Sequence, residues 1–236
     1  MSSLCYDQEG VNQYREAALK HREVLRTAEE RMDAAIENGD KAEAEAALKD
    51  ATASGEAFKA LRSTLSRTDL FVAKYNIQVH GPHEVSFVLP RGVSRYEMLC
   101  EAQELVAERD KLDLVYPDHL KEWANDARFT ASCESPERIQ INGHVKGGDE
   151  KTRKQQEKFL TTKGLEQAQL EDLAAAFVAH YVATGQDLFE DKWVRAVGGA
   201  LNFDSDGLYV SAVGVGNSDS RVAVASRVRP ELKKTR

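Results

Sequence analysis

The residues best suited by type and spacing to do chemistry are Asn202, Asp204 and Asp206, which are followed by Gly207. Alternate oxygen ligands before a tight-turn glycine form the opening of a calcium-binding loop. Position twelve of such a loop is Val213, where a bidentate glutamate is needed, and the flanking residues alternate like strands. Because Asp-Gly is also a strong hairpin-turn signal, the sequence favours a turn, with calcium binding as the alternative.

A second candidate is a transition-metal site at the Gly-Pro turn between His80 and His83. Imidazole and carboxylate groups are common ligands of such metals. His80, His83 and Glu84 would form a site if the fold brought them to His119 or His144. Histidines at a turn are more often solvated surface residues, so we predict no cofactor and keep this metal site as an alternative.

The remaining nucleophiles and bases have structural interpretations. His180 lies on the most apolar predicted helix, where we expect a hydrogen-bonded core histidine. Cys133 lies in a Ser-Cys-Glu-Ser loop, and no neighbouring positive charge there lowers its pKa or activates a Cys133–His144 pair. Catalytic residues are therefore unknown, and the sequence favours a protein that is not an enzyme.

Residues 1–66 are predicted to form an antiparallel helical hairpin, a coiled-coil-like arm. Small and apolar side chains recur there at three- and four-residue steps in two segments of nearly equal length. Between the segments, Gly39 suits a left-handed helix end and Asp40 suits the N-cap of the next helix. Symmetric pairing about this turn predicts the following neighbours: Tyr14 and Leu65, Ala18 and Leu61, Leu25 and Ser54, Met32 and Ala47.

Residues 67–236 are predicted to form an α+β domain with several helices and a C-terminal antiparallel β-meander. The capping box Ser94-Arg95-Tyr96-Glu97 starts a helix, and residues 166–184 should form the most buried helix. Short turns join the C-terminal strands, which makes them antiparallel. The other expected elements are helices at 119–127 and 150–160 and strands at 75–80, 84–89, 138–142, 193–197, 200–203, 208–215 and 221–228.

Composition and charge restrict the classes of partner. The chain has 236 residues, a net charge of −7, 42% hydrophobic and 30% charged residues, which is ordinary for a folded globular protein. Basic residues gather at 221–236, where we expect a solvated tail. With Lys146, Lys151, Arg153 and Lys154 they would make a phosphate-binding patch if the fold brought the two groups together. Aromatic residues for base stacking do not interleave them, so we do not expect nucleic-acid binding.

The same composition bears on the expected compartment. No apolar stretch is long enough for a bilayer, so we expect no membrane partner. The first five residues lack the features of a secretory signal. Three cysteines without metal-type spacing fit a reducing interior, and we expect a cytoplasmic protein.

The sequence therefore predicts an intracellular interaction or structural protein that uses residues 11–66 for self-association or for binding a protein partner. One alternative is a small-molecule or metal-dependent enzyme with a pocket between the 166–184 helix and the sheet. Another is a nucleic-acid-associated accessory protein that uses the basic C-terminal tail. Two histidines converging with a carboxylate would favour the enzyme, whereas an apolar stripe on the outside of the arm would favour assembly.

Overall fold

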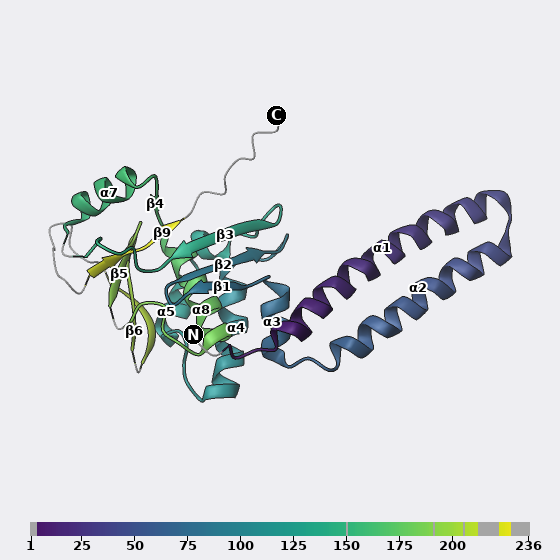
Figure 1. Cartoon of the computed structure of the whole chain (residues 1–236), viewed down its shortest axis with the longest axis horizontal. Helices are drawn as coiled ribbons and strands as arrows, with labels where there is room; N and C mark the ends of the chain where they lie inside the picture. Colours follow the sequence, from purple (N-terminus) through teal and green to yellow (C-terminus); the bar gives the residue numbers. More distant parts are fainter. Residues whose placement is uncertain (1–3, 150, 191, 205, 212–221, 228–236) are drawn as a thin grey trace. The chain divides into compact units, whose positions relative to one another are not determined.

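The computed structural model describes residues 4–149, 151–190, 192–204, 206–211 and 222–227. The chain divides into two compact units, one formed by Tyr6–Ala73 and the other by Met1–Cys5 with Lys74–Arg236. The first unit is helical and the second combines helices with two sheets, which confirms the predicted α+β class (Figure 1). Among the described residues, no helix combines the length and apolar character needed to cross a membrane.

The first unit is built on a helical hairpin of α1 (Gln8–Asn38) and α2 (Lys41–Arg62). Gly39 adopts the left-handed conformation with φ 69°, which favours glycine. The Asp40 carboxylate accepts hydrogen bonds from the backbone N–H groups of Ala42 and Glu43 in the first turn of α2. The predicted turn and both of its capping residues are confirmed.

The register of the hairpin differs from the prediction by about one helical turn. Ser54 Oγ lies 2.9 Å from His21 Nδ1, although symmetric pairing placed Ser54 beside Leu25. The Phe58 ring stacks on Tyr14 and His21, with ring centroids 5.0 and 5.3 Å apart. Counting residues from the turn takes no account of these large rings, which stack on one another in the observed register.

A third helix, α3 (Arg67–Lys74), follows the hairpin, where the sequence predicted no helix. The buried Asp69 carboxylate accepts hydrogen bonds from the backbone N–H and hydroxyl of Ser66 and from the backbone N–H of Asp7, at 2.6–2.8 Å. Arg15 donates to the Val72 carbonyl at 2.8 Å. These bonds tie the start of α3 to the base of the hairpin.

The first sheet of the second unit has five strands in the order β1-β2-β3-β9-β4, and every pair is antiparallel. The predicted hairpin of strands 75–80 and 84–89 is found here, with its first strand starting at Gln78, and so is the strand at 138–142. Its strands are β1 (Gln78–Gly81), β2 (Glu84–Leu89), β3 (Glu137–Asn142), β4 (Glu166–Gln167) and β9 (Ser226–Arg227).

The second sheet has the order β7-β6-β5-β8. Its strands β5 (Trp193–Ala196), β6 (Gly199–Asp204) and β7 (Gly207–Ser211) form the predicted antiparallel meander. The fourth strand, β8 (Val222–Val224), instead runs parallel to β5. Residues 212–221 and 228, where the last two expected strands continue, lie outside the described residues.

The strand expected at 221–228 is divided between the two sheets. After β8, the chain crosses at Ala225, and β9 inserts between β3 and β4 of the first sheet. Ala225 itself donates to the Arg195 carbonyl and accepts from Ala168. The backbone groups of this short segment are thus hydrogen-bonded within both sheets, a division that local sequence does not encode.

The most buried helix is α8 (Leu170–Thr184), in which all residues except Glu171 and Tyr181 are buried. It packs against α4 (Arg95–Asp110), β2, β3 and β6. The predicted start at residue 166 is wrong, because Glu166–Gln167 form β4 and pair with β9. The predicted capping box of α4 is present, with Ser94 and Glu97 capping each other's backbone N–H groups.

Three shorter helices complete the second unit. The helix expected at 119–127 is divided, because Asp126 accepts a hydrogen bond from the Arg128 N–H and starts a new helix. The helix expected to end near 160 is present, with Thr152 as its N-cap. The three helices are α5 (Pro117–Trp123), α6 (Ala127–Thr130) and α7 (Arg153–Thr162).

Candidate functional site

A groove of 680 Å³ runs between α1 and α2 on one face of the helical hairpin. Alanines of both helices form part of its walls, together with longer polar and apolar side chains. Ala53 and Ala57 line it from α2 and are exposed to solvent. A surface of short side chains lets another helix approach closely.

Charged side chains of both signs lie along the rim of this groove. Arg31 bridges the two helices, with Nε 2.7 Å from Glu43 and Nη1 2.7 Å from Asp50. The hydrogen bonds that Arg31 donates to these carboxylates raise its pKa. Lys20 and Glu23 line the rim further along α1. The electrostatic charge along the rim is therefore mixed, with positive and negative side chains side by side.

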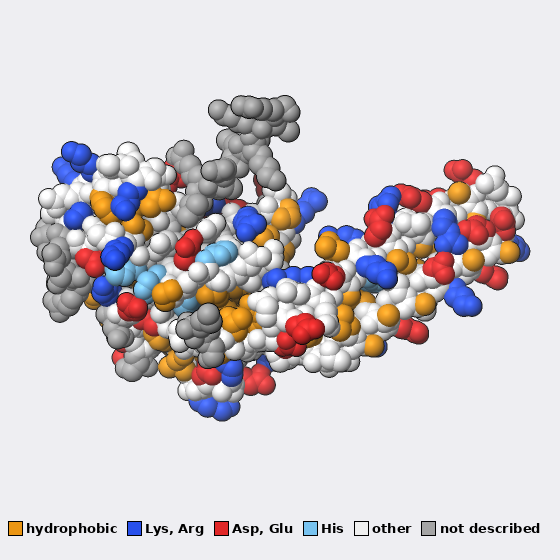
Figure 2. Space-filling model, in the orientation of Figure 1, with side chains coloured by type: hydrophobic (Ala, Val, Ile, Leu, Met, Phe, Trp, Pro, Cys, Tyr) orange, Lys and Arg blue, Asp and Glu red, His pale blue; other side chains and the backbone are white. Residues whose placement is uncertain are grey.

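Large apolar side chains are exposed on the helical hairpin outside the groove. Seven large hydrophobic residues are exposed in the described part of the chain, and four of them lie on α1 or α2. Leu19 is 65% exposed, Ile36 is 68% exposed, and Leu25 and Leu48 are also exposed. Figure 2 shows apolar side chains interspersed with charged ones along this unit.

The calcium-type sequence Asn202-Phe203-Asp204 lies on β6 and continues through the turn into β7. The Asp204 carboxylate accepts from the Asp206 N–H at 2.9 Å, and the Asn202 amide oxygen accepts from the Phe203 N–H at 2.7 Å. Gly207 has φ 106°, in the region that favours glycine. These oxygens are used by the local backbone, so the segment has the geometry of a hairpin turn.

His80, Glu84 and His119 each have other local partners. His80 Nε2 lies 2.9 Å from Ser86 Oγ, and Glu84 accepts from the Gln140 amide at 2.7 Å. His119 stacks on Trp123, with ring centroids 6.0 Å apart. In the described part of the chain, none of the three belongs to a group of converging metal-type donors.

The structure does bring His83 and His144 together, with Glu190 as a third donor. One ligand atom from each of the three residues lies within 4.8 Å of the other two. The two imidazole rings are edge to face, with centroids 5.3 Å apart. Glu190 and the nearby Asp149 were missed in the sequence, because no local pattern connects them with either histidine.

The other titratable candidates are held in structural roles. Burial raises the pKa of Cys133, whose Sγ lies 3.7 Å from the Glu137 carboxylate. His180 is fully buried, its Nδ1 lies 3.1 Å from the Gln186 carbonyl, and burial lowers its pKa. Neither group has the environment of an activated nucleophile or a base poised near neutral pH.

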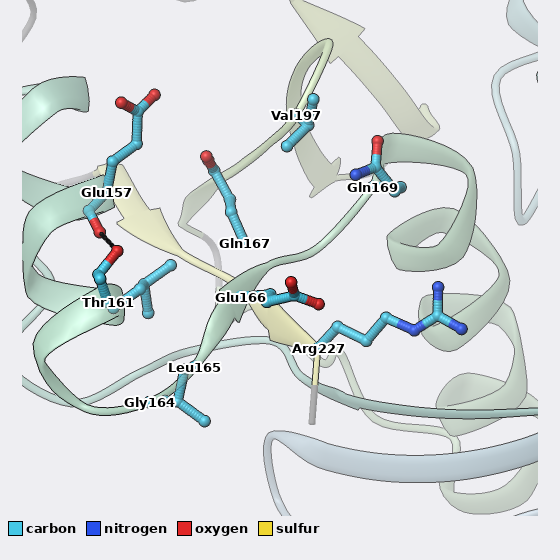
Figure 3. Close-up of a pocket in the computed structure, with 10 residues that line it drawn as sticks. Glu157, Thr161, Gly164, Leu165, Glu166, Gln167, Gln169, Val197 and Arg227 are labelled. Carbon is cyan, nitrogen blue, oxygen red and sulfur yellow. Dashed lines mark hydrogen bonds between the residues drawn. The ribbon is translucent and has the colours of Figure 1, made fainter. Parts of the chain in front are cut away.

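A cavity of 540 Å³ lies beside α7 and β4. In Figure 3, Glu157 and Thr161 form one side of it, and Gln167, Gln169 and Val197 lie across from them. The Arg227 guanidinium, the cationic group in the lining, is already bound by two carboxylates of the second unit. Among the described residues that line the cavity, the cation is therefore already paired with carboxylates.

Those carboxylates belong to a network of two arginines and two acids. Arg95 and Arg227 each contact both Asp172 and Glu137, with distances of 2.7–3.0 Å. Asp172 is buried at the start of α8, and Glu137 begins β3. The network thus links α4, α8, β3 and β9, and we interpret it as structural.

The basic tail falls mostly outside the described residues, which end at Arg227 in this region. Of the lysines expected to join it, Lys151 lies with its Nζ 5.5 Å from the centre of the Phe159 ring.

Comparison of the chain with protein-family models, with curated proteins and with solved structures gives no match.

Proposed function

We propose that this protein self-associates through its helical hairpin, with α1 and α2 of one copy packing on α1 and α2 of a second copy. The observation that supports the proposal is the groove of 680 Å³ lined by exposed alanines. Four exposed large apolar residues on the same two helices add to it. Exposed apolar surface on a helical unit is a feature of interaction sites.

The geometry of the groove suits a second copy of the same helices. Short side chains at the contact allow close helix packing, as in antiparallel four-helix bundles. Lys20 and Glu23 on the rim carry opposite charges, as do Arg31 and Asp50. A two-fold related copy therefore meets a mixed surface and not a repulsive one.

The test is the mass of the full chain in solution, measured by sedimentation equilibrium. We expect a dimer for the native protein and a monomer for the double variant Ala53→Glu/Ala57→Glu, because charges in the groove oppose apolar packing. Both alanines are exposed, so helicity by circular dichroism should be retained.

The matched control is Ala60→Glu, which adds the same charge at an exposed position of α2 that does not line the groove. This variant should remain dimeric. A monomeric native chain at high micromolar concentration, or equal dissociation by the control, would exclude the groove as the contact surface.

We also propose a cytoplasmic location and no catalytic role for the hairpin. The support for the location is chemical: Cys5, Cys100 and Cys133 are all free thiols, which fits a reducing compartment.

A further inference from the structure

We propose that the second unit binds a divalent transition-metal ion of the zinc type through His83, His144 and Glu190. The three side chains come from segments far apart in the sequence. His83 lies between β1 and β2, His144 follows β3, and Glu190 precedes β5. One ligand atom from each lies within 4.8 Å of the others. Two imidazoles and a carboxylate form a known donor set for zinc, which leaves further positions for water.

The hydrogen bonds of His83 indicate that a cation belongs beside it. Its Nδ1 lies 3.1 Å from the Leu188 carbonyl, which only accepts, so Nδ1 carries a hydrogen. Nε2 lies 3.2 Å from Glu190 Oε1, and where Nε2 carries no hydrogen both atoms are acceptors. Two acceptors at this distance repel each other unless a proton or a metal ion lies between them.

A carboxylate lies beside one nitrogen of the second imidazole. His144 Nε2 lies 3.0 and 3.1 Å from the two Asp149 oxygens. Lys192 Nζ lies 3.3 Å from the same carboxylate. A carboxylate on one ring nitrogen fixes the orientation of the ring and strengthens the other nitrogen as a ligand.

The backbone holds the histidine-bearing loops together before any ion binds. The Gly143 N–H donates to the His83 carbonyl at 2.7 Å, which joins the residue before His144 to the other histidine. A Cβ at Gly143 would lie 2.8 Å from Leu188 Cγ, so this close approach requires glycine. The site is therefore preorganised by main-chain contacts.

The third ligand also has an unusual backbone. Glu190 has φ 52°, in the left-handed region that a glutamate rarely adopts. It follows Leu188 and Phe189, which are fully buried, and Phe189 packs on Phe177 of α8. A strained residue held next to such an anchor is typical of functional sites. Its side chain is 58% exposed, whereas those of His83 and His144 are 21% and 14% exposed, so an ion has access from solvent.

The test is calorimetric titration of zinc into tag-free, chelator-treated full-length protein, with cobalt absorption as a second measurement. We expect one ion per chain and a rise in melting temperature with zinc. His83→Ala, His144→Ala and Glu190→Gln should each weaken binding by at least about ten-fold. Glu190→Gln is the key variant, because its exposed position makes misfolding an inadequate explanation of the loss.

His80→Ala and His119→Ala are the matched controls, since these histidines lie outside the group. Both should bind zinc with native affinity, and calcium should give no heat because the donor set is rich in nitrogen. A flat zinc trace at millimolar metal would overturn the proposal and leave a proton as the cation between His83 and Glu190. Zinc binding unchanged in Glu190→Gln and both ligand-histidine variants would also overturn it.

Discussion

Gly143 is a residue at which the packing of the second unit leaves no room for a side chain. Gly143→Ala places a Cβ 2.8 Å from Leu188 Cγ, and Leu188 is fully buried. We expect a loss of about 1–3 kcal/mol in unfolding free energy, because one of the two segments must move. Gly81→Ala is the control, because a Cβ there meets nothing within 4 Å. Denaturant titration should separate the two variants, and equal stabilities would contradict the close approach.

Glu137 should make the protein less stable in acid. Burial raises its pKa, but hydrogen bonds and charges from Arg227 and Arg95 outweigh burial, so the pKa lies below the ordinary 4.5. A depressed folded-state pKa contributes stability above the unfolded-state value, and this stability is lost as pH falls through the folded-state value. Glu137→Gln should therefore lower stability at neutral pH and flatten its decline below pH 4.5.

The measurement is a series of urea midpoints from neutral pH down to about pH 3. Glu134→Gln is the control, because Glu134 is an exposed carboxylate in the segment before β3. The Glu134→Gln variant should show the same dependence of the urea midpoint on pH as the native protein. An unchanged slope in Glu137→Gln would show that the arginines do not stabilise the ionised Glu137.

At the scale of elements, the seam of the helical hairpin is most sensitive where small residues are fully buried. Ala47 has no exposed surface, and the observed register places it at the level of Ala28, which is also buried. Ala47→Leu should overpack this seam and cost about 1–3 kcal/mol. Ala60→Leu, an exposed position on the same helix, should change stability by less than about 0.5 kcal/mol. Thermal melts compare them, and equal costs would show that the register is wrong.

At the scale of the whole molecule, the boundary between the units at Ala73 defines a truncation. Residues 74–236 should unfold cooperatively on their own, because their two sheets and α8 form a separate core. A truncation that starts at Arg67 keeps α3 but removes the Asp7 N–H that bonds to Asp69. Calorimetry should show a sharp transition for the shorter chain, and a broad, non-cooperative one would mean that the hairpin belongs to the core.

Several elements were predictable because their signals are local. Gly39 and Asp40 end one helix and start the next within two residues. Ser94 and Glu97 form the expected capping box, and Asp206-Gly207 form the expected turn. In each of these cases, the residues that form the turn or cap lie within a few positions of one another. The local sequence is therefore enough to specify the feature.

The sequence by itself thus determined the fold class, the helical hairpin and most of the local boundaries. Only the tertiary structure decided the hairpin register, the parallel pairing of β8 with β5, and the meeting of His83 with Glu190. These features depend on contacts between segments tens of residues apart. Such contacts depend on the packing of the whole core. They leave no periodicity or capping pattern in the local sequence from which they could be predicted.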